Sequence, residues 1–467
     1  MKTDFSISHY RLKITLVLLI LLLILILAPA CQIINPVPAL LQQGDKFYAQ
    51  GLYQQAITSY TKAIEIQPNL TVAYANRALA YNQTGQYDLA ITDCNKALSI
   101  DRKNILAFIA RAAAYIETGA YDDAIADCNS ALKIHPKYSQ AYINRAWAYY
   151  QMGLYQQAID DCSVAIKLDP KLAFVYITRA RSYNEIGSYE DAIKDLDKAL
   201  SFADCPPSAY INRAWAYLET GQYELAMADY NKAIQLEPDK AINYANRAWG
   251  FTKRGEFDRA IADCETALRL DSNLPLTYAN RAWAYLEKSA FDSSKNYYEL
   301  AVTDCDRALS LNPEYVPGYT IRAWAYIYVG AYRLAIIDCN KALEINPNYM
   351  LSYNVRAWAF IGTRDFDLAI ADCSAAIGVH PEFAAPYSTR AVAYRENGQL
   401  DLALADCNQA LLLDDELALA YLNRGVIYIR KGVPEKARLD FLKVLEVTRD
   451  PELIATAQAQ LAELNAK

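Results

Sequence analysis

The chain is poor in the residues that usually carry metal or acid–base chemistry. It contains only three histidines, and His135 and His380 each stand directly before a proline with no partner motif beside them. None of its ten cysteines follows another at the two-residue spacing that is typical of zinc sites. The sequence also has no phosphate-binding loop and no paired nucleophile and base. We therefore expect a protein that is not an enzyme and that holds no metal and no cofactor.

Basic residues are also fewer than acidic residues. The sequence has 46 Lys and Arg residues against 53 Asp and Glu residues, which gives a formal net charge of −7. A protein that binds nucleic acid usually carries a basic stripe. The charge balance therefore argues against a nucleic-acid partner.

What the sequence has in abundance is a repeat. An arginine returns at one fixed spacing along the chain, except for a single longer step between Arg281 and Arg322. A period between about 20 and 50 residues indicates a stacked array, in which every unit contributes one piece of a continuous core. The arginines are Arg77, Arg111, Arg145, Arg179, Arg213, Arg247, Arg281, Arg322, Arg356, Arg390 and Arg424.

Each repeat has the pattern of two helices joined by a tight turn. A Tyr or Phe lies three residues before the arginine and another lies four residues after it, as Tyr74 and Tyr81 do, so both fall on one helical face. Two alanines seven residues apart, such as Ala90 and Ala97, fall on the second helix. A glycine such as Gly85 supplies the turn between the helices, and in most units a proline ends the second helix.

This pattern resembles the tetratricopeptide repeat family over about residues 37–451. The resemblance implies an all-α, right-handed superhelical solenoid of about twelve helix-turn-helix repeats. We expect residues 452–467 to form a C-terminal capping helix, because the last repeat would otherwise expose an apolar face. The expected repeats are 37–70, 71–104, 105–138, 139–172, 173–206, 207–240, 241–274, 275–315, 316–349, 350–383, 384–417 and 418–451.

An aspartate follows each repeated arginine at a constant separation, as Asp93 follows Arg77, and at a greater one in the long unit, where Asp304 follows Arg281. The first repeat lacks both residues and has Gln43 and Ser59 in their places. Because the arginine and the aspartate are present together in eleven repeats and absent together in the first, we predict an ion pair between the two helices of a repeat. A structural role for this pair is favoured over ligand binding. Members of the family usually have an apolar residue in place of the arginine, so this sequence departs from the common pattern.

Eight of the ten cysteines occupy one slot of the repeat. Leu196, Tyr230 and Phe441 fill the same slot in other units, so the slot is apolar and cysteine acts there as a small hydrophobic residue. Equivalent positions of stacked helices lie at least about 8–10 Å apart, whereas a disulfide requires Cα atoms within roughly 7 Å. We therefore expect free buried thiols, with Cys205 in an exposed loop. The eight are Cys94, Cys128, Cys162, Cys264, Cys305, Cys339, Cys373 and Cys407.

The N-terminus carries the one long apolar run of the chain. Ile14 to Leu27 are fourteen residues with a single threonine as the only polar one, and no basic residue follows until Lys46. Because basic residues precede the run, the repeats are predicted to lie outside the cytoplasm, in the periplasm or at the cell surface. Residues 1–36 fit a cleaved signal peptide, a lipoprotein signal with lipidation at Cys31, or an uncleaved membrane anchor. The second and third alternatives would tether the repeats to a membrane.

All six tryptophans stand two residues after the arginine. This slot lies roughly 140–160° around the helix from the core aromatic residues, so it is not a core position. The resemblance implies that the slot faces the inner, concave surface. A solvent-facing stripe of aromatic residues usually indicates contact with a partner. The predicted partner-binding tryptophans are Trp147, Trp215, Trp249, Trp283, Trp324 and Trp358.

Asparagines stand one residue before the arginine in many units. Spaced along a groove, they suit hydrogen bonds to the backbone of an extended peptide of any sequence. Five of them are predicted to bind the partner: Asn76, Asn144, Asn212, Asn246 and Asn280. Glutamates near the ends of the same helices would add an acidic rim: Glu117, Glu185, Glu219, Glu287 and Glu396.

These patterns predict a non-catalytic scaffold that binds an extended segment of another protein in its concave groove. The identity of that partner stays open. The alternative is carbohydrate binding, or a role in envelope, polysaccharide or pilus assembly, because tryptophan faces and amide side chains also suit sugar rings. The carboxylate clamp with which some family members hold the tails of chaperones is not supported. Its lysine and asparagine positions are occupied here by Ala, Ile and Trp.

Overall fold

The computed structural model describes residues 35–203, 205–292 and 296–466, and every regular element in these ranges is a helix. The chain divides into two compact units, one up to Ser188 and one from Tyr189 onward. The division falls inside the fifth predicted repeat, between its two helices. Nothing in the repeat pattern indicates a boundary at this place.

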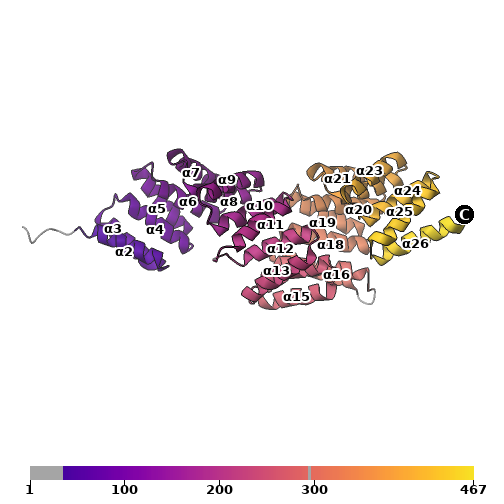
Figure 1. Ribbon diagram of the computed structural model, residues 1–467, viewed down its shortest axis with the longest axis horizontal. Coiled ribbons are helices and arrows are strands. Elements are labelled where there is room, and N and C mark those ends of the chain that lie inside the picture. Colours follow the sequence, from indigo (N-terminus) through magenta and orange to yellow (C-terminus); the bar gives the residue numbers. More distant parts are fainter. Residues whose placement is uncertain (1–34, 204, 293–295, 467) are drawn as a thin grey trace, which may run out of the picture. The chain divides into compact units, whose positions relative to one another are not determined.

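Unit 1 contains four helix pairs and the first helix of a fifth (Figure 1). The helices are α2 (Val37–Ala49), α3 (Tyr53–Ile66), α4 (Thr71–Gln83), α5 (Tyr87–Ile100), α6 (Ile105–Glu117), α7 (Tyr121–Ile134), α8 (Ser139–Gln151), α9 (Tyr155–Leu168) and α10 (Ala173–Glu185).

Unit 2 begins with the second helix of the fifth repeat and continues with seven helix pairs and a final helix. The helices are α11 (Tyr189–Leu200), α12 (Ser208–Glu219), α13 (Tyr223–Leu236), α14 (Ala241–Lys253), α15 (Phe257–Leu270), α16 (Pro275–Ser289), α17 (Tyr297–Leu311), α18 (Val316–Tyr328), α19 (Tyr332–Ile345), α20 (Met350–Thr363), α21 (Phe366–Val379), α22 (Ala384–Glu396), α23 (Leu400–Leu413), α24 (Ala418–Arg430), α25 (Pro434–Val447) and α26 (Pro451–Ala466).

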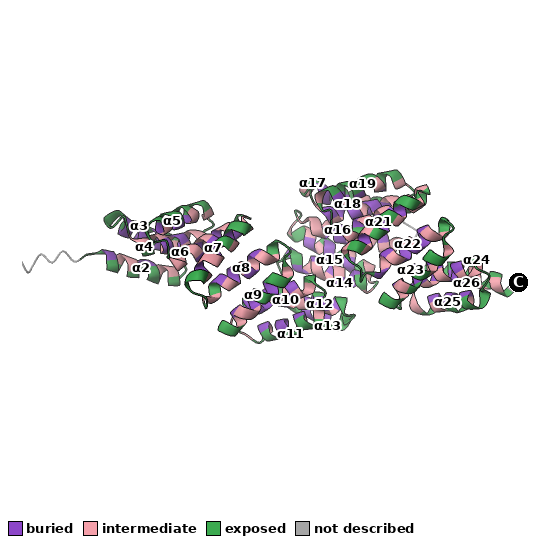
Figure 2. Cartoon of the chain, turned by 90° about the horizontal axis from the view of Figure 1, so that it is seen from above, coloured by how far each residue is buried: buried purple, intermediate pink, exposed green. Residues whose placement is uncertain are grey.

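The predicted all-α solenoid of helix pairs is confirmed. Within each unit the two helices of a pair pack on each other, and each second helix packs on the first helix of the next pair. First helices also contact the first helices of neighbouring pairs, whereas no two second helices of the described residues do. The first helices are therefore the more closely spaced row, and they form the inner face of each unit. Figure 2 shows buried residues where helices face one another and exposed residues at the turns.

In every pair except α16 and α17, the turn between the two helices contains one described residue with a left-handed backbone. Gly85 has a φ of 72°, and the N–H of Gln86 donates to the carbonyl of Tyr81, which closes the end of α4. Glycine adopts this conformation without steric cost. In the turn between α20 and α21 Arg364 takes the same place with a φ of 67°, the one non-glycine residue of the described chain with positive φ.

The predicted ion pairs that lie within one compact unit are formed, and each is bidentate. In unit 2, Arg213 donates from Nε to Oδ2 of Asp229 at 2.7 Å and from Nη2 to Oδ1 at 2.8 Å. Ten arginines make this contact with the aspartate of their own repeat. The remaining members of the predicted series, Arg179 and Asp195, belong to different units. The hydrogen bond with Asp229 raises the pKa of Arg213 above its usual value.

Ten of the repeated arginines, all except Arg281, also donate a hydrogen bond to the preceding repeat, a contact that the sequence pattern did not indicate. Nη1 of Arg77 donates to Oγ1 of Thr61 on α3 at 2.9 Å, and Nη1 of Arg424 donates to Oδ1 of Asn408 on α23 at 2.9 Å. The flanking aromatic residues hold the guanidinium between them, with Cζ of Arg77 5.6 Å from the ring centre of Tyr74. One arginine therefore joins three helices, and the ion pair links neighbouring repeats as well as the two helices of one repeat.

The cysteine slot is packed tightly against alanines, and aromatic residues in the slot are matched by glycines. Where Phe441 replaces cysteine, Gly425 replaces the alanine after the arginine, and a Cβ at Gly425 would lie 2.6 Å from the ring. Tyr60 and Gly44 form the same combination in the first pair, with 2.4 Å between the ring and such a Cβ. Volume is therefore conserved across the slot, as close packing requires.

Candidate partner-binding face

The six tryptophans lie on first helices, as predicted. Trp147 is on α8, and the other five are on α12, α14, α16, α18 and α20 of unit 2. Trp215 is 40% exposed and the other five are half-buried. The rings therefore present part of their surface on the inner face, while the rest contributes to packing between repeats.

In unit 1, Trp147 is the centre of an aromatic group. Its ring stacks on Tyr150 with 5.4 Å between ring centres and an interplanar angle of 20°. Phe174 of α10 lies 5.7 Å away in a tilted arrangement, and its side chain is 49% exposed. The guanidinium of Arg181 lies 5.5 Å from the Trp147 ring centre, within the range of a cation–π contact.

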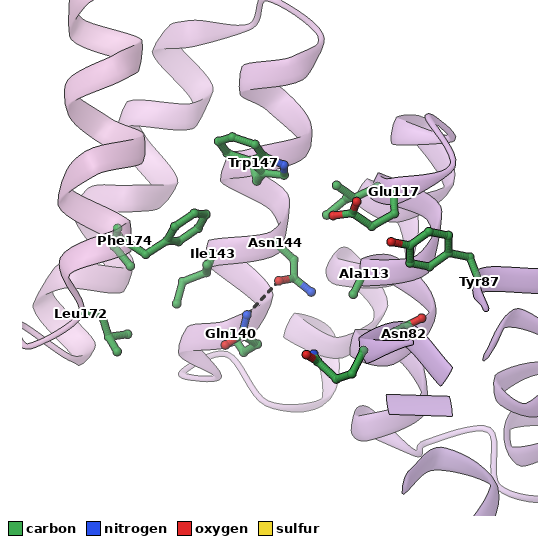
Figure 3. Close-up of a pocket in the computed structure, with 13 residues that line it drawn as sticks. Asn82, Tyr87, Ala113, Glu117, Gln140, Ile143, Asn144, Trp147, Leu172 and Phe174 are labelled. Atoms are coloured by element: carbon green, nitrogen blue, oxygen red, sulfur yellow. Dashed lines mark hydrogen bonds between the residues drawn. The ribbon is translucent and has the colours of Figure 1, made fainter. Parts of the chain in front are cut away.

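This aromatic group borders a pocket of about 590 Å³ on the inner face of unit 1 (Figure 3). Ala113 of α6 lines this pocket, and it occupies the slot that holds tryptophan in six other repeats. Trp147, Phe174 and Ile143 supply apolar walls, and Glu117 and Gln140 supply polar ones. Ala113, Gln140 and Phe174 were absent from the predicted site. Comparison of the repeats reveals Ala113 as the small residue in the tryptophan slot, whereas nothing in the pattern singles out Phe174.

The predicted asparagines lie on the first helices, but several of their amide groups take part in contacts within the fold. Nδ2 of Asn144 donates to the carbonyl of Ile109 at 3.3 Å, and Nδ2 of Asn280 donates to the carbonyl of Ala245 at 2.9 Å. Both asparagines are buried, and each bond joins a first helix to the first helix of the preceding repeat. The pattern within one repeat could not reveal this use, because the acceptor belongs to another repeat.

The other three predicted asparagines are half-buried. Nδ2 of Asn76 donates to Oδ1 of Asp45 at 2.9 Å, and Nδ2 of Asn212 donates to the carbonyl of Ser208 at 2.9 Å within its own helix. Asn246 lies on α14, two turns before the C-terminal end of that helix. Contact between these residues and a partner stays a prediction.

In unit 2 the inner face combines aromatic rings with charged groups. Nζ of Lys253 lies 5.2 Å from the ring centre of Trp249. Tyr328 is 54% exposed and stacks on Tyr298 with 5.2 Å between ring centres. Burial raises the pKa of Glu287, Asp450 raises it further, and Lys253 lowers it. Asp450 precedes α26, so the start of the final helix contributes negative charge to this part of the inner face.

The cysteines do not form a chemical site. The eight cysteines of the repeated slot are free and buried, as predicted, and Cys205 is partly exposed. Burial raises the pKa of the Cys94 thiol to about 12. Burial also raises the pKa of Cys128 and of Cys407, which occupy the same slot in other repeats. A thiol with so high a pKa is not a nucleophile near neutral pH. The described part of the chain holds no group of His, Cys, Asp and Glu side chains suited to a metal ion.

The predicted membrane segment cannot be compared with the structure. Ile14 to Leu27 and Cys31 lie outside the described residues, so their roles stay predictions. Among the helices that the structure describes, none is both long enough and apolar enough to span a bilayer.

Comparison with sequence families identifies the fold directly, and the chain belongs to the tetratricopeptide repeat family. Four models described as tetratricopeptide repeat or TPR repeat match it, over residues 44–85, 71–104, 139–172, 175–204, 207–240, 316–349, 354–418 and 388–453. The stretches 105–138 and 241–315 fall between these matches, yet they form the same helix pairs.

Solved structures with the same fold include the APC/C hetero-tetramer Cut9–Hcn1. That match covers 94% of this chain and 99% of the other, with 14% identity and a TM-score of 0.50. Yeast Tom70 matches over 92% of this chain and 96% of its own, with 19% identity and a TM-score of 0.43. A tetratricopeptide repeat protein from Parabacteroides merdae matches over 56% of this chain and 99% of its own, with 23% identity and a TM-score of 0.43. At 14% identity, the similarity to Cut9–Hcn1 shows the fold alone.

Proposed function

We propose that this protein is a non-catalytic scaffold that binds an extended segment of another protein along the inner face formed by its first helices. The observation that supports this most is the row of partly exposed tryptophans on those helices. Apolar aromatic surface in contact with water is unfavourable, and a partner that covers it would gain binding free energy. Aromatic residues in such places dominate the energetics of many interfaces.

The inner face of unit 2 offers the clearest test. Trp215 is 40% exposed, the largest exposed fraction among the six tryptophans, so Trp215→Ala removes the most contact surface. We expect Trp215→Ala combined with Trp249→Ala to weaken partner binding by at least about tenfold. Leu225→Ala is the matched control, because Leu225 is 49% exposed but lies on the second helix α13.

The partner can be identified with a photo-crosslinking amino acid at position 215 of the full-length chain, followed by mass spectrometry of the adducts. The same residue at position 225 gives the background. A partner captured equally from both positions, or retained fully by the double tryptophan variant, would contradict binding on the inner face. A glycan array that binds the wild-type chain and not the double variant would replace the peptide partner with a carbohydrate.

We also propose that the apolar run Ile14 to Leu27 directs the repeats out of the cytoplasm and, as an anchor or through lipidation of Cys31, tethers them to a membrane. Support comes from the basic residues before the run and their absence until Lys46. Mass measurement of the mature N-terminus distinguishes a cleaved signal peptide, lipidation at Cys31 and an uncleaved membrane anchor. An intact N-terminus on a chain found entirely in a detergent-free soluble fraction would exclude all three.

A further inference from the structure

The pocket of unit 1 contains one formally charged side chain. Glu117 lines it, and all the other lining residues are neutral. Glu117 is exposed, and in the described part of the chain no ion-pair partner neutralises it. Its carboxylate faces the space in front of Trp147 (Figure 3). The pocket therefore presents negative charge beside an aromatic wall.

Glu117 stands at an electrostatically unfavourable position. It is the last residue of α6, where the carbonyl groups of the helix end carry partial negative charge. The last residues of the neighbouring first helices α4 and α8 are Gln83 and Gln151, so the fold accepts a neutral amide at this place. A carboxylate here destabilises the helix end, and a bound cation would offset that effect.

The amides near Glu117 do not supply the missing positive partner. Nε2 of Gln140 donates to Oδ1 of Asn144 at 2.8 Å, and Nδ2 of Asn144 donates to the carbonyl of Ile109. Nδ2 of Asn82 donates to the carbonyl of Ala110 at 2.7 Å. Arg181 contacts the Trp147 ring but is not among the lining residues. Burial raises the pKa of Glu185, and Arg181 lowers it.

The walls of the pocket suit an alkyl chain. Ile143 is buried, Trp147 is half-buried and Phe174 is 49% exposed, so Trp147 and Phe174 present apolar surface that a ligand can cover. A volume of about 590 Å³ falls inside the usual range for ligand sites, and it has room for more than one side chain. Long cationic side chains place their methylene groups on such surfaces and keep the charged end in water.

We propose that this pocket binds a lysine or arginine side chain of an extended partner segment, with a large apolar side chain of the same segment against Phe174. The methylene groups would lie along Trp147 and Ile143, and the cationic end would pair with Glu117. Arg181 already shows that the Trp147 ring accepts a guanidinium as a neighbour. This inference rests on the proposed function, because it names the chemistry of the segment that the inner face of unit 1 receives.

The test uses a bead library of randomised nonapeptides, screened with the fluorescently labelled full-length chain and two variants. The wild type is expected to enrich Lys and Arg over Asp and Glu by roughly tenfold at one peptide position, next to an enriched Leu, Phe or Trp. Glu117→Gln is expected to lose the basic preference and keep the apolar one. Its melting temperature should be unchanged or higher, because the same amide ends α4 and α8.

Ala113→Trp is the second variant, and it should block the pocket without unfolding the chain. Tryptophan occupies this slot in six other repeats, five of them consecutive, so the fold tolerates it there. The variant is expected to lose the selected peptides and to melt as the wild type does. Leu89→Ala, at a side chain 47% exposed on the second helix α5, is the matched control and should bind normally.

The outcomes separate this inference from the proposed function. Enrichment of acidic residues, or a basic preference that Glu117→Gln retains, would overturn the role of Glu117. Apolar enrichment alone, abolished by Ala113→Trp, would overturn the basic partner and leave inner-face binding in place. Peptides retained by Ala113→Trp but lost by the Trp215 and Trp249 variant would move binding to unit 2, and glycan binding sensitive to Ala113→Trp would replace the peptide altogether.

Discussion

The first helix pair and the pairs that follow it meet the same packing requirement with different residues. In α2 and α3 the place of the ion pair is taken by Gln43 and Ser59, and the hydroxyl of Tyr60 donates to Asp45 at 2.7 Å. Asn76 of the next pair donates to the same carboxylate. The following pairs instead use the bidentate arginine and aspartate.

The difference explains what the arginine does. From the second pair onward, Nη1 of every repeated arginine except Arg281 donates to a polar residue on the preceding second helix, for example from Arg111 to Asn95. No helix of the described residues precedes α2, so an arginine at position 43 would have no such acceptor. The ion pair is therefore better understood as a link between repeats than as a link within one repeat.

Removing one member of an ion pair should give the largest loss of stability. Arg213→Ala leaves the buried Asp229 without its bidentate donor and should lower the free energy of unfolding by about 3–5 kcal/mol. Replacing both residues with leucine should cost less, because no uncompensated charge remains. Urea unfolding followed by circular dichroism measures both, and equal losses would count against the pairing. Gln43→Ala in the first pair is the control and should change stability little.

An intermediate effect is expected where glycine faces an aromatic residue. Gly425→Ala places a Cβ 2.6 Å from the Phe441 ring and should destabilise the last pair by about 1–3 kcal/mol. Combining it with Phe441→Leu should recover part of the loss, because Leu196 occupies the same slot in another repeat, where an alanine follows the arginine. Hydrogen exchange of α24 and α25 localises the effect. A neutral Gly425→Ala variant would show that the volume match is not required.

The smallest change in stability is expected at Glu287, a carboxylate without a bidentate partner. Burial and Asp450 raise the pKa of Glu287, so the folded state favours the protonated form. Its stabilising contribution is fully present below the unfolded pKa of about 4.3 and is lost as pH rises through the folded value. Glu287→Gln should therefore raise the melting temperature slightly at pH 7 and leave it unchanged at pH 4. Asp450→Asn should reproduce part of the gain, and a gain of equal size at both pH values would contradict the assignment.

Much of the fold was predictable because its signals recur at one spacing. Tyr74 and Tyr81 share a face through the geometry of a single helix, and the arginine and aspartate of a repeat are close in sequence. The burial of the cysteine slot followed from the apolar residues that replace cysteine at Leu196, Tyr230 and Phe441. Each of these inferences needed only the contacts inside one helix pair.

The candidate site was less predictable, because it depends on contacts between repeats. The stripe of tryptophans was found from the sequence, but the use of Asn144 and Asn280 to hold the preceding first helix was not. The pocket of unit 1 also requires Ala113, Trp147 and Phe174 to meet from three different helices. No single repeat contains that arrangement.

The sequence by itself determined the helix pairs, their number and the register of the residues that face each other inside a pair, since helical periodicity and turn glycines act over a few residues. Only the tertiary structure decided the hydrogen bond from most of the arginines to the preceding repeat, the pairing of Phe441 with Gly425, the division after Ser188 and the pocket beside Glu117. These features depend on the distance and rotation between stacked helices. Those quantities result from the packing of side chains on separate helices, which a repeated local pattern does not specify.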